Sequence, residues 1–335
     1  MSPSFEDIDS KVEKAQGDKA RFLKSKEGLL PHFEFPSGET KEEKHYSKET
    51  LLADMYEEKL DQMKEAMQNP ILLENAYIDL KKDATRGSEK EGKNTGSAAW
   101  ALLSISAFVI MDRFSRLFPE KQNEINLYIE NPIFLENVYK ILQDDVVEGS
   151  EKEGEDKESC ASLAFRTLSA LITTHFISRL SAEQQNKIVL YFENPILLEN
   201  AYQYIEDRVI FGSKKEEKNT GSAAWALLSI SALITTDILS RFSPERQNKI
   251  NSYLESSTLL ENIFQRMGNS VGAGSEKEGI NAENATWAFQ IFSSLATVKD
   301  YLREKGKKID DENFAKEALN PTEKIPPRPE GILGK

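Results

Sequence analysis

Cysteine and histidine are scarce in this chain. Its 335 residues include one cysteine, Cys160, and three histidines. A single cysteine cannot form a disulfide within the chain, and no set of Cys and His residues has the spacing of a structural zinc site. We therefore expect no disulfide framework, no metal and no cofactor, and the composition fits a reducing compartment.

Long hydrophobic runs are also lacking. The longest nearly apolar run, residues 98–111, spans about 14 residues and contains two serines, whereas a membrane-spanning helix needs roughly 20 apolar residues. The opening segment MSPSFEDIDSKVEK has no apolar stretch typical of a secretory signal peptide. We expect a soluble, cytoplasmic protein without a transmembrane segment.

Positive charge is in deficit. The formal net charge is −13, the pI is near 5.0, and the chain has no dense run of Lys or Arg. Nucleic acids and anionic membranes are bound mainly through clusters of basic residues. Neither is therefore expected as a partner.

Motifs of known enzymes are missing as well. GAGSEKEG at Gly272 resembles a phosphate-binding glycine pattern loosely, but it follows a helical segment instead of a strand. The acidic run 144–156 lacks the alternating ligands of a calcium loop. His175 is predicted to be packed within an apolar helix. The sequence predicts no catalytic residue and no enzyme.

What the chain does have is an internal repeat. A segment opening with NPILLEN at Asn69 returns as NPIFLEN at Asn131, NPILLEN at Asn194 and SSTLLEN at Ser256, at intervals of 62, 63 and 62 residues. A fixed period of this size is the signature of tandem structural repeats. The chain then divides into residues 1–46 (a helix and an irregular link), 47–68 (a capping helix), 69–130, 131–193, 194–255 and 256–308 (four repeats, the last degenerate), and 309–335 (a short helix and a Pro-rich tail).

Each repeat is predicted to contain three helices. The first begins at Asn69-Pro70, where the Asn side chain can accept a backbone N–H and Pro suits the first helical position. Gly87 is predicted to end this helix in a left-handed conformation. The equivalent glycines are Gly149, Gly212 and Gly274.

The second helix is predicted over residues 98–117 of the first copy and is apolar nearly all round its first half. Such a helix belongs in the interior. Trp100, Trp225 and Trp287 hold equivalent places in it, so we expect them to belong to the core instead of forming an exposed binding surface.

The third helix is predicted to begin at Ser243-Pro244 and its equivalents, with a capping box between Ser181 and Gln184. In the fourth copy no third helix is evident, because the charged stretch 299–308 stands there, followed by a short predicted helix over 311–319.

The segment 47–68 has apolar residues at helical spacing and ends where the first repeat begins. It occupies the slot that the last helix of a preceding repeat would fill, and we expect it to cap the stack.

The segments KNTGSAAWALLSIS at 93–106 and at 218–231 are similar to the second and third helices of HEAT and armadillo repeats, where a charged turn precedes an alanine-rich apolar helix. The resemblance covers about residues 47–298, although the period here is longer than theirs. It implies an all-α fold, a right-handed α-solenoid of four tandem three-helix repeats with helical caps, that binds a protein or an extended peptide.

Asparagine recurs at two places in the repeat. The first is the Asn of LLEN, which is unusual in the middle of a helix. It either resembles the asparagine ladder by which armadillo proteins hold a peptide backbone, or satisfies backbone groups of an adjacent unit. The second place, in the third helix, allows the same two interpretations. The candidate residues are Asn75, Asn137, Asn200 and Asn262, and Asn123, Asn186 and Asn248.

Three functions remain open from the sequence. The first is a protein- or peptide-binding scaffold, adaptor or inhibitor without catalysis. The second is a secreted bacterial effector or effector regulator, suggested by the tail that ends GILGK. The third is a HEAT-like enzyme with an acidic pocket.

Overall fold

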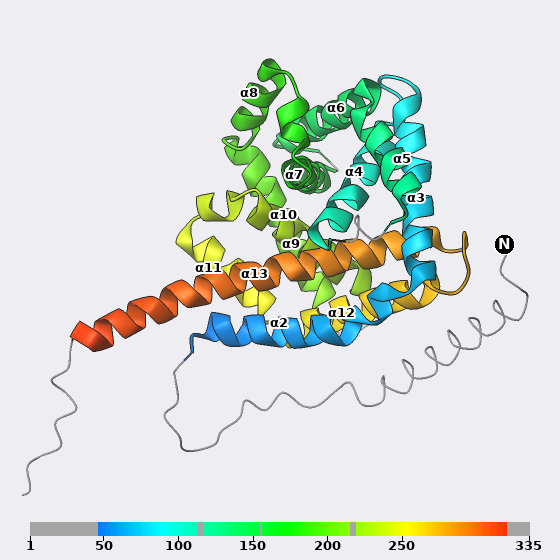
Figure 1. The fold of residues 1–335 in the computed structure, drawn as a ribbon. Helices are drawn as coiled ribbons and strands as arrows, with labels where there is room; N and C mark the ends of the chain where they lie inside the picture. The colour runs from blue at the N-terminus through cyan, green and yellow to red at the C-terminus, as the bar shows by residue number, and fades with distance from the viewer. Residues whose placement is uncertain (1–45, 113–116, 155, 215–218, 320–335) are drawn as a thin grey trace, which may run out of the picture.

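The structure is a computed structural model that describes residues 46–112, 117–154, 156–214 and 219–319. Within these ranges the chain is helical and has no strand, which confirms the all-α class (Figure 1). Across the described residues, none of the helices combines the length and apolar character needed to cross a membrane. The predicted lead-in helix and link before residue 46, and the tail after residue 319, lie outside these ranges.

Four equivalent first helices open the repeats: α3 (Pro70–Glu89), α6 (Pro132–Gly149), α9 (Pro195–Gly212) and α12 (Ser257–Gly274). The side chains of Asn69, Asn131 and Asn194 each accept a hydrogen bond from the backbone N–H two residues later, at 2.9, 2.9 and 3.0 Å. This confirms the predicted Asn-Pro caps. In the fourth copy Ser256 caps the helix, since its side chain accepts a hydrogen bond from the N–H of Leu259 at 3.3 Å.

A glycine recurs at or near the end of each first helix, but the reason differs from the predicted left-handed backbone conformation. Among the described glycines, positive φ angles occur at Gly92 and Gly279, not at these four positions. A Cβ on any of the four would lie 2.6 to 2.7 Å from backbone atoms of an alanine in the following helix. The predicted left-handed cap is therefore wrong, and glycine is needed because two helix backbones approach closely. The contacting pairs are Gly87 with Ala98, Gly149 with Ala161, Gly212 with Ala223, and Gly274 with Ala285.

The second helices form the centre of the fold. They are α4 (Thr95–Ile110), α7 (Lys157–Thr173), α10 (Thr220–Thr235) and α13 (Ala282–Leu319). Helix α4 packs against α7, α7 against α10, α10 against α13, and α13 against α4. We call this four-helix centre the hub.

The second helix of each of the first three units ends just before a residue with a positive φ angle, and this residue has the same position in all three units. Asp112, His175 and Asp237 occupy it in the first three copies, and all three have φ between 50° and 58°. This left-handed conformation, which Asp and His tolerate better than most residues, stops the helix. His175 is therefore exposed in a turn, and its predicted packing within a helix is wrong. In the fourth copy Lys299 stands at this position, and α13 continues through it.

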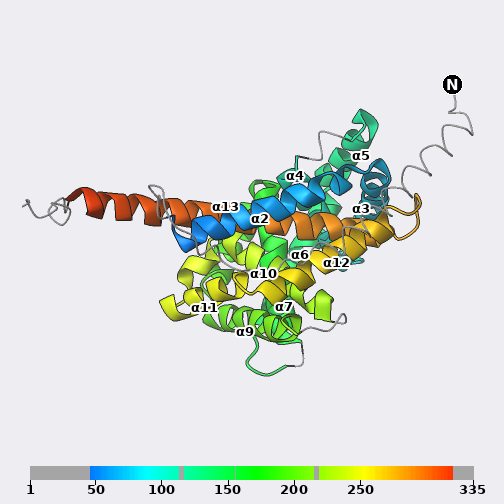
Figure 2. The same ribbon diagram turned by 90° about the horizontal axis from the view of Figure 1, so that it is seen from below.

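The fourth copy thus has one long helix where the sequence analysis expected a break over 299–308 and a separate helix over 311–319. Helix α13 runs unbroken over 38 residues, and its C-terminal end extends beyond the rest of the described fold (Figures 1 and 2).

Third helices occur in the first three copies as α5 (Pro119–Glu130), α8 (Ala182–Tyr191) and α11 (Pro244–Leu254). The capping box of Ser181 and Gln184 is confirmed. Short 3-10 turns, η3 (Phe176–Arg179) and η5 (Ile238–Arg241), precede α8 and α11.

The fourth copy receives its third helix from the other end of the chain. Helix α2 (Lys48–Lys64), followed by the turn η1 (Ala66–Gln68), lies along α13 (Figures 1 and 2). Its buried Met63 precedes the first unit by the same six positions as buried Ile125, Ile188 and Ile250 precede the following units. The slot assigned to residues 47–68 from the sequence therefore belongs to the fourth unit.

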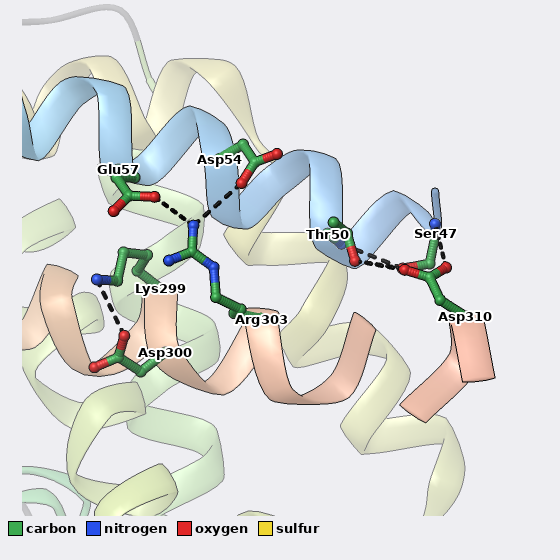
Figure 3. Close-up of polar contacts among 8 residues, drawn as sticks. All are labelled: Ser47, Thr50, Asp54, Glu57, Lys299, Asp300, Arg303 and Asp310. Atoms are coloured by element: carbon green, nitrogen blue, oxygen red, sulfur yellow. Dashed lines mark hydrogen bonds and ion pairs between the residues drawn. The ribbon is translucent and has the colours of Figure 1, made fainter. Parts of the chain in front are cut away.

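Polar contacts fasten α2 to α13 (Figure 3). The guanidinium of Arg303 bonds the carboxylates of Asp54, at 3.1 Å, and Glu57. Asp310 accepts from the backbone N–H of Ser47 at 2.7 Å and from the Thr50 hydroxyl at 2.9 Å. These contacts join residues about 250 positions apart in the sequence.

The four units close on themselves. Helix α3 packs against α6, α6 against α9, α9 against α12, and α12 against α3, in the same cyclic order as the hub. We call this closed arrangement the ring. An open stack leaves an apolar face at each end, whereas here the first and fourth units cover each other's faces. The structure therefore does not show the open right-handed superhelix expected from the sequence.

Gly212→Ala tests the close helix approach. A methyl group there meets the Ala223 backbone at 2.7 Å, so we expect the free energy of unfolding to fall by about 1–3 kcal/mol in urea titrations. The matched control is Gly221→Ala in the next helix, where nothing lies within 4 Å and a gain of about 0.5–1 kcal/mol is expected. Equal effects of the two changes would contradict the packing argument.

Candidate functional site

The LLEN asparagines lie at the junctions between units. Asn137 of the second unit is fully buried. Its Nδ2 donates to the backbone carbonyls of Gly87, Lys90 and Lys93 in the first unit, at 2.8, 2.9 and 3.2 Å. Its Oδ1 accepts from the N–H of Gly92 at 2.6 Å. One side chain thus satisfies the end of the preceding first helix and the loop that follows it.

The other three asparagines repeat this contact. Asn75 is the one that joins the first unit to the fourth, since its Nδ2 donates to the carbonyls of Gly274, Lys277 and Ile280 and its Oδ1 accepts from Gly279 N–H. Asn200 bonds the carbonyls of Gly149 and Glu151, and Asn262 bonds those of Gly212 and Lys214, at 2.6 to 3.0 Å. All four side chains are at most 6% exposed.

The structure therefore places Asn75, Asn137, Asn200 and Asn262 inside the ring, hydrogen-bonded to protein backbone, and not on a surface open to a peptide. This corrects their selection as candidate partner-binding residues. An amide serves here because it donates and accepts at once, as a helix end and its loop require.

The glutamate of LLEN has a separate structural partner in the third helix of its own unit. Glu74 pairs with Lys121, Glu136 Oε2 accepts from Gln184 Nε2 at 3.2 Å, and Glu199 Oε1 accepts from Arg246 Nη2 at 2.8 Å. The motif therefore contacts the adjacent unit through Asn and the third helix of its own unit through Glu.

The asparagines of the third helices are exposed to solvent, in contrast to the buried LLEN asparagines. Asn123, Asn186 and Asn248 are exposed on α5, α8 and α11, at the periphery of the fold (Figure 1). Leu127 and Leu190, one helical turn further on, are 67% and 63% exposed. Large apolar side chains with this much exposure are candidates for contact with another molecule.

The three tryptophans meet at the hub. Trp225 and Trp287 have ring centroids 5.0 Å apart, and Trp100 lies 6.0 Å from each. They are half-buried and pack on one another, and Trp287 also packs against the hydrophobic core, so the predicted core position holds only in part. Leu163 holds the equivalent place on α7.

Arg166 lies beside this tryptophan cluster and is 2% exposed. Its guanidinium carbon is 4.4 Å from the Trp225 ring centroid and 5.4 Å from that of Trp100, which is cation–π geometry. Burial lowers the pKa of Arg166 to about 10, so the group stays charged at neutral pH. Its Nη1 has no hydrogen-bond partner among the described residues.

A cavity of about 40 Å³ opens beside Arg166, between the four hub helices. Gln290, which is 4% exposed and whose Oε1 also has no partner among the described residues, lines it from α13. The remaining lining side chains are Leu, Ile, Ala, Ser and Thr. A cation and hydroxyl groups line this cavity, so it does not correspond to the acidic pocket of the enzyme hypothesis.

Comparison with protein-family models, with curated proteins and with solved structures gives no match for this chain. The resemblance to HEAT and armadillo repeats therefore stays a prediction.

The sequence analysis missed Arg166 and Gln290. Aligning the units places them at the position of Leu103 and Leu228 in the first and third copies. The sequence signal that could have identified them is a polar residue at a position where the other two units have leucine. The sequence alone does not show that this position is buried. It becomes buried in the hub, where the second helices of all four units meet.

Asn137→Ala tests the junction contact. The change leaves four backbone groups without their partner, so we expect the free energy of unfolding to fall by about 2–4 kcal/mol in chemical denaturation. Asn123→Ala, at an exposed position, is the control and is expected to stay within about 0.5 kcal/mol of wild type. Equal stabilities of the two variants would refute the structural role of the LLEN asparagine.

A buried carboxylate predicts the pH dependence of stability. Asp145 on α6 is 7% exposed, and burial, with Glu148 and Asp144 nearby, raises its pKa to about 7. The Cys160 thiol of α7 faces the same group of acids and donates to Glu148. The folded state thus holds the Asp145 proton more tightly than the unfolded chain does.

Because the folded pKa is raised, this contribution is present at low pH and is lost as pH rises from about 4 to about 7. We expect wild type to lose on the order of 2 kcal/mol of stability between pH 5 and pH 8, and Asp145→Asn to remove that part of the dependence. If the free energies of unfolding of the two proteins, measured by urea titration, changed in parallel with pH, the assigned role of Asp145 would be ruled out.

Proposed function

We propose that this protein is a non-catalytic binding module that holds a protein partner on the outer faces of its third helices. The proposal includes adaptor, scaffold and inhibitor roles. The observation that carries it is a repeated pattern of exposed side chains: Glu120, Asn123 and Leu127 on α5 return as Glu183, Asn186 and Leu190 on α8.

Helical geometry puts each trio on one face. Residues three and seven positions apart lie on the same side of a helix, so Glu, Asn and Leu form a stripe directed away from the ring. The opposite side of α5 carries Ile125 and Ile129, and that of α8 carries Ile188, all buried against the core. The outward stripe is therefore not needed to hold the helix in place.

The stripe has the chemistry of a protein contact. Burying a leucine that is two-thirds exposed contributes roughly 1.5–3 kcal/mol, and the neighbouring asparagine can donate and accept hydrogen bonds. The glutamates and the net charge of −13 favour a partner with Lys or Arg around an apolar residue. Glu183 already pairs with Lys187 at 3.0 Å, and an exposed pair of this kind is weak enough to exchange partners.

The third copy provides a matched reference within the molecule. On α11 the equivalent residues are Glu245, Asn248 and Ser252, so the leucine is replaced by serine at a position that is also exposed. The proposal therefore assigns the main contact to α5 and α8.

Photo-crosslinking at single sites tests the proposal. A photoreactive residue is placed at 127, at 190 or at 252 of the full-length protein, in cells that make it naturally. We expect the same protein to be captured from positions 127 and 190 but not from 252, because the two leucines are the anchors. Adducts that are the same at all three positions, or none, would contradict the proposal.

The purified captured partner then allows a quantitative check. Leu127→Ser with Leu190→Ser, which copies the third unit, should weaken binding at least about 30-fold, as for loss of a binding hot spot. Stability should change by less than about 0.5 kcal/mol per site, since both residues are exposed.

A further inference from the structure

The hub contains a buried positive charge that no carboxylate of the described residues neutralises. Arg166 is 2% exposed, its Nη1 lacks a hydrogen-bond partner among the described residues, and no carboxylate lines the cavity beside it. The rings of Trp100 and Trp225 stabilise the cation on one side. A buried guanidinium without an anion is costly, because its hydration is lost and not replaced.

The cavity meets Arg166 on the side of the hub away from the tryptophan cluster. Its inner end is formed by Arg166 and Gln290. Further along the same helices it is lined by the hydroxyl groups of Ser106, Ser169 and Ser231, one turn beyond the Arg166 level. Hydroxyl groups from three different helices thus surround one small space, although that of Ser231 already donates to the Leu228 carbonyl or the Ser294 hydroxyl.

The lining of this space is more exposed at one end than at the other. Ile110, Thr235 and Thr297 form the outer part of the lining, and they are exposed or half-buried, whereas Arg166 and Gln290 are buried. The buried cation therefore lies at the closed end of a recess with an open mouth.

The dimensions limit what the recess can hold. A volume of about 40 Å³ has room for roughly three water molecules, since one occupies about 10–15 Å³ by this measure. A nucleotide or a peptide side chain with its backbone does not fit. An anion the size of formate or bicarbonate does.

We propose that the hub recess binds a small oxyanion of the carboxylate type, with Arg166 as the charged donor and Ser106 and Ser169 as neutral donors. Planar oxygens match the fork of guanidinium N–H groups. The anion replaces the missing counter-charge of Arg166 and links the second unit to its neighbours across the hub. This site is separate from the outer faces proposed to bind a protein.

The chain carries its own reporter for this site. All three of its tryptophans lie in the cluster beside Arg166, so intrinsic tryptophan fluorescence reports from the hub. Sodium formate is titrated into the full-length protein against sodium chloride at constant ionic strength. We expect a saturable change in emission with formate and, at about ten times its Kd, a rise in Tm of roughly 3–6 °C.

Repeat-matched variants assign the response. Arg166→Leu introduces the residue that Leu103 and Leu228 provide in sister units, and Arg166→Gln introduces that of Gln290. Either change should abolish the formate response. Arg179→Leu, which removes an exposed arginine from the same unit, should retain it.

Two results would overturn the proposal. One is a wild-type response to formate no larger than that to chloride, which would mean that water alone occupies the recess. The other is an unchanged formate response in a folded Arg166 variant.

Discussion

One buried asparagine per unit, bound to the backbone of the unit before it, is the contact on which the ring depends. Four backbone carbonyls or N–H groups at a helix end have no partner within the helix itself, and a neighbour must supply one if they are buried. Asn137 does so between the first two units, and Asn75 does so between the fourth and the first. The last contact of the series is also the one that closes the chain into a ring. Helix α2 then completes the fourth unit, where Arg303 and Asp310 of α13 hold it in place.

Closure separates the molecule into two chemical environments. The first and third helices carry polar residues whose partners are neighbouring units or solvent, whereas the hub brings α4, α7, α10 and the first half of α13 together through their buried apolar residues. In such a centre a single departure from the repeat has a large effect. Arg166, at the position where two sister units have leucine, places a buried cation beside the recess. The charge in the hub therefore comes from the divergence of the repeats, whereas the outer stripes come from their similarity.

Much of the local structure could be predicted from the sequence, because caps and apolar periodicity are local signals. The Asn-Pro starts and the Ser181 capping box are examples. Closure could not be predicted, because it depends on contacts between residues about 200 positions apart in the sequence, such as those of Asn75 with Gly274 and Lys277. The long α13 was predictable in principle, since Lys299 replaces the Asp or His that stops the other second helices. Asn123, Asn186 and Asn248 stay predictions of function, whereas Leu127 and Leu190 could be singled out only from their exposure in the structure.

Cross-linking with a zero-length carbodiimide tests the closed ring most directly. Lys48 pairs with Glu255, and Lys305 with Glu49, so each pair joins the N-terminal helix to the end of the third unit or to α13. Mass spectrometry of the cross-linked monomer should identify both pairs, together with Lys121–Glu74 and Lys249–Glu206, which lie within single units and form in an open or a closed array. The account predicts all four links at comparable yield. Recovery of the two links within units without either link to α2 would contradict closure, and with it the assignment of Asn75 and the hub.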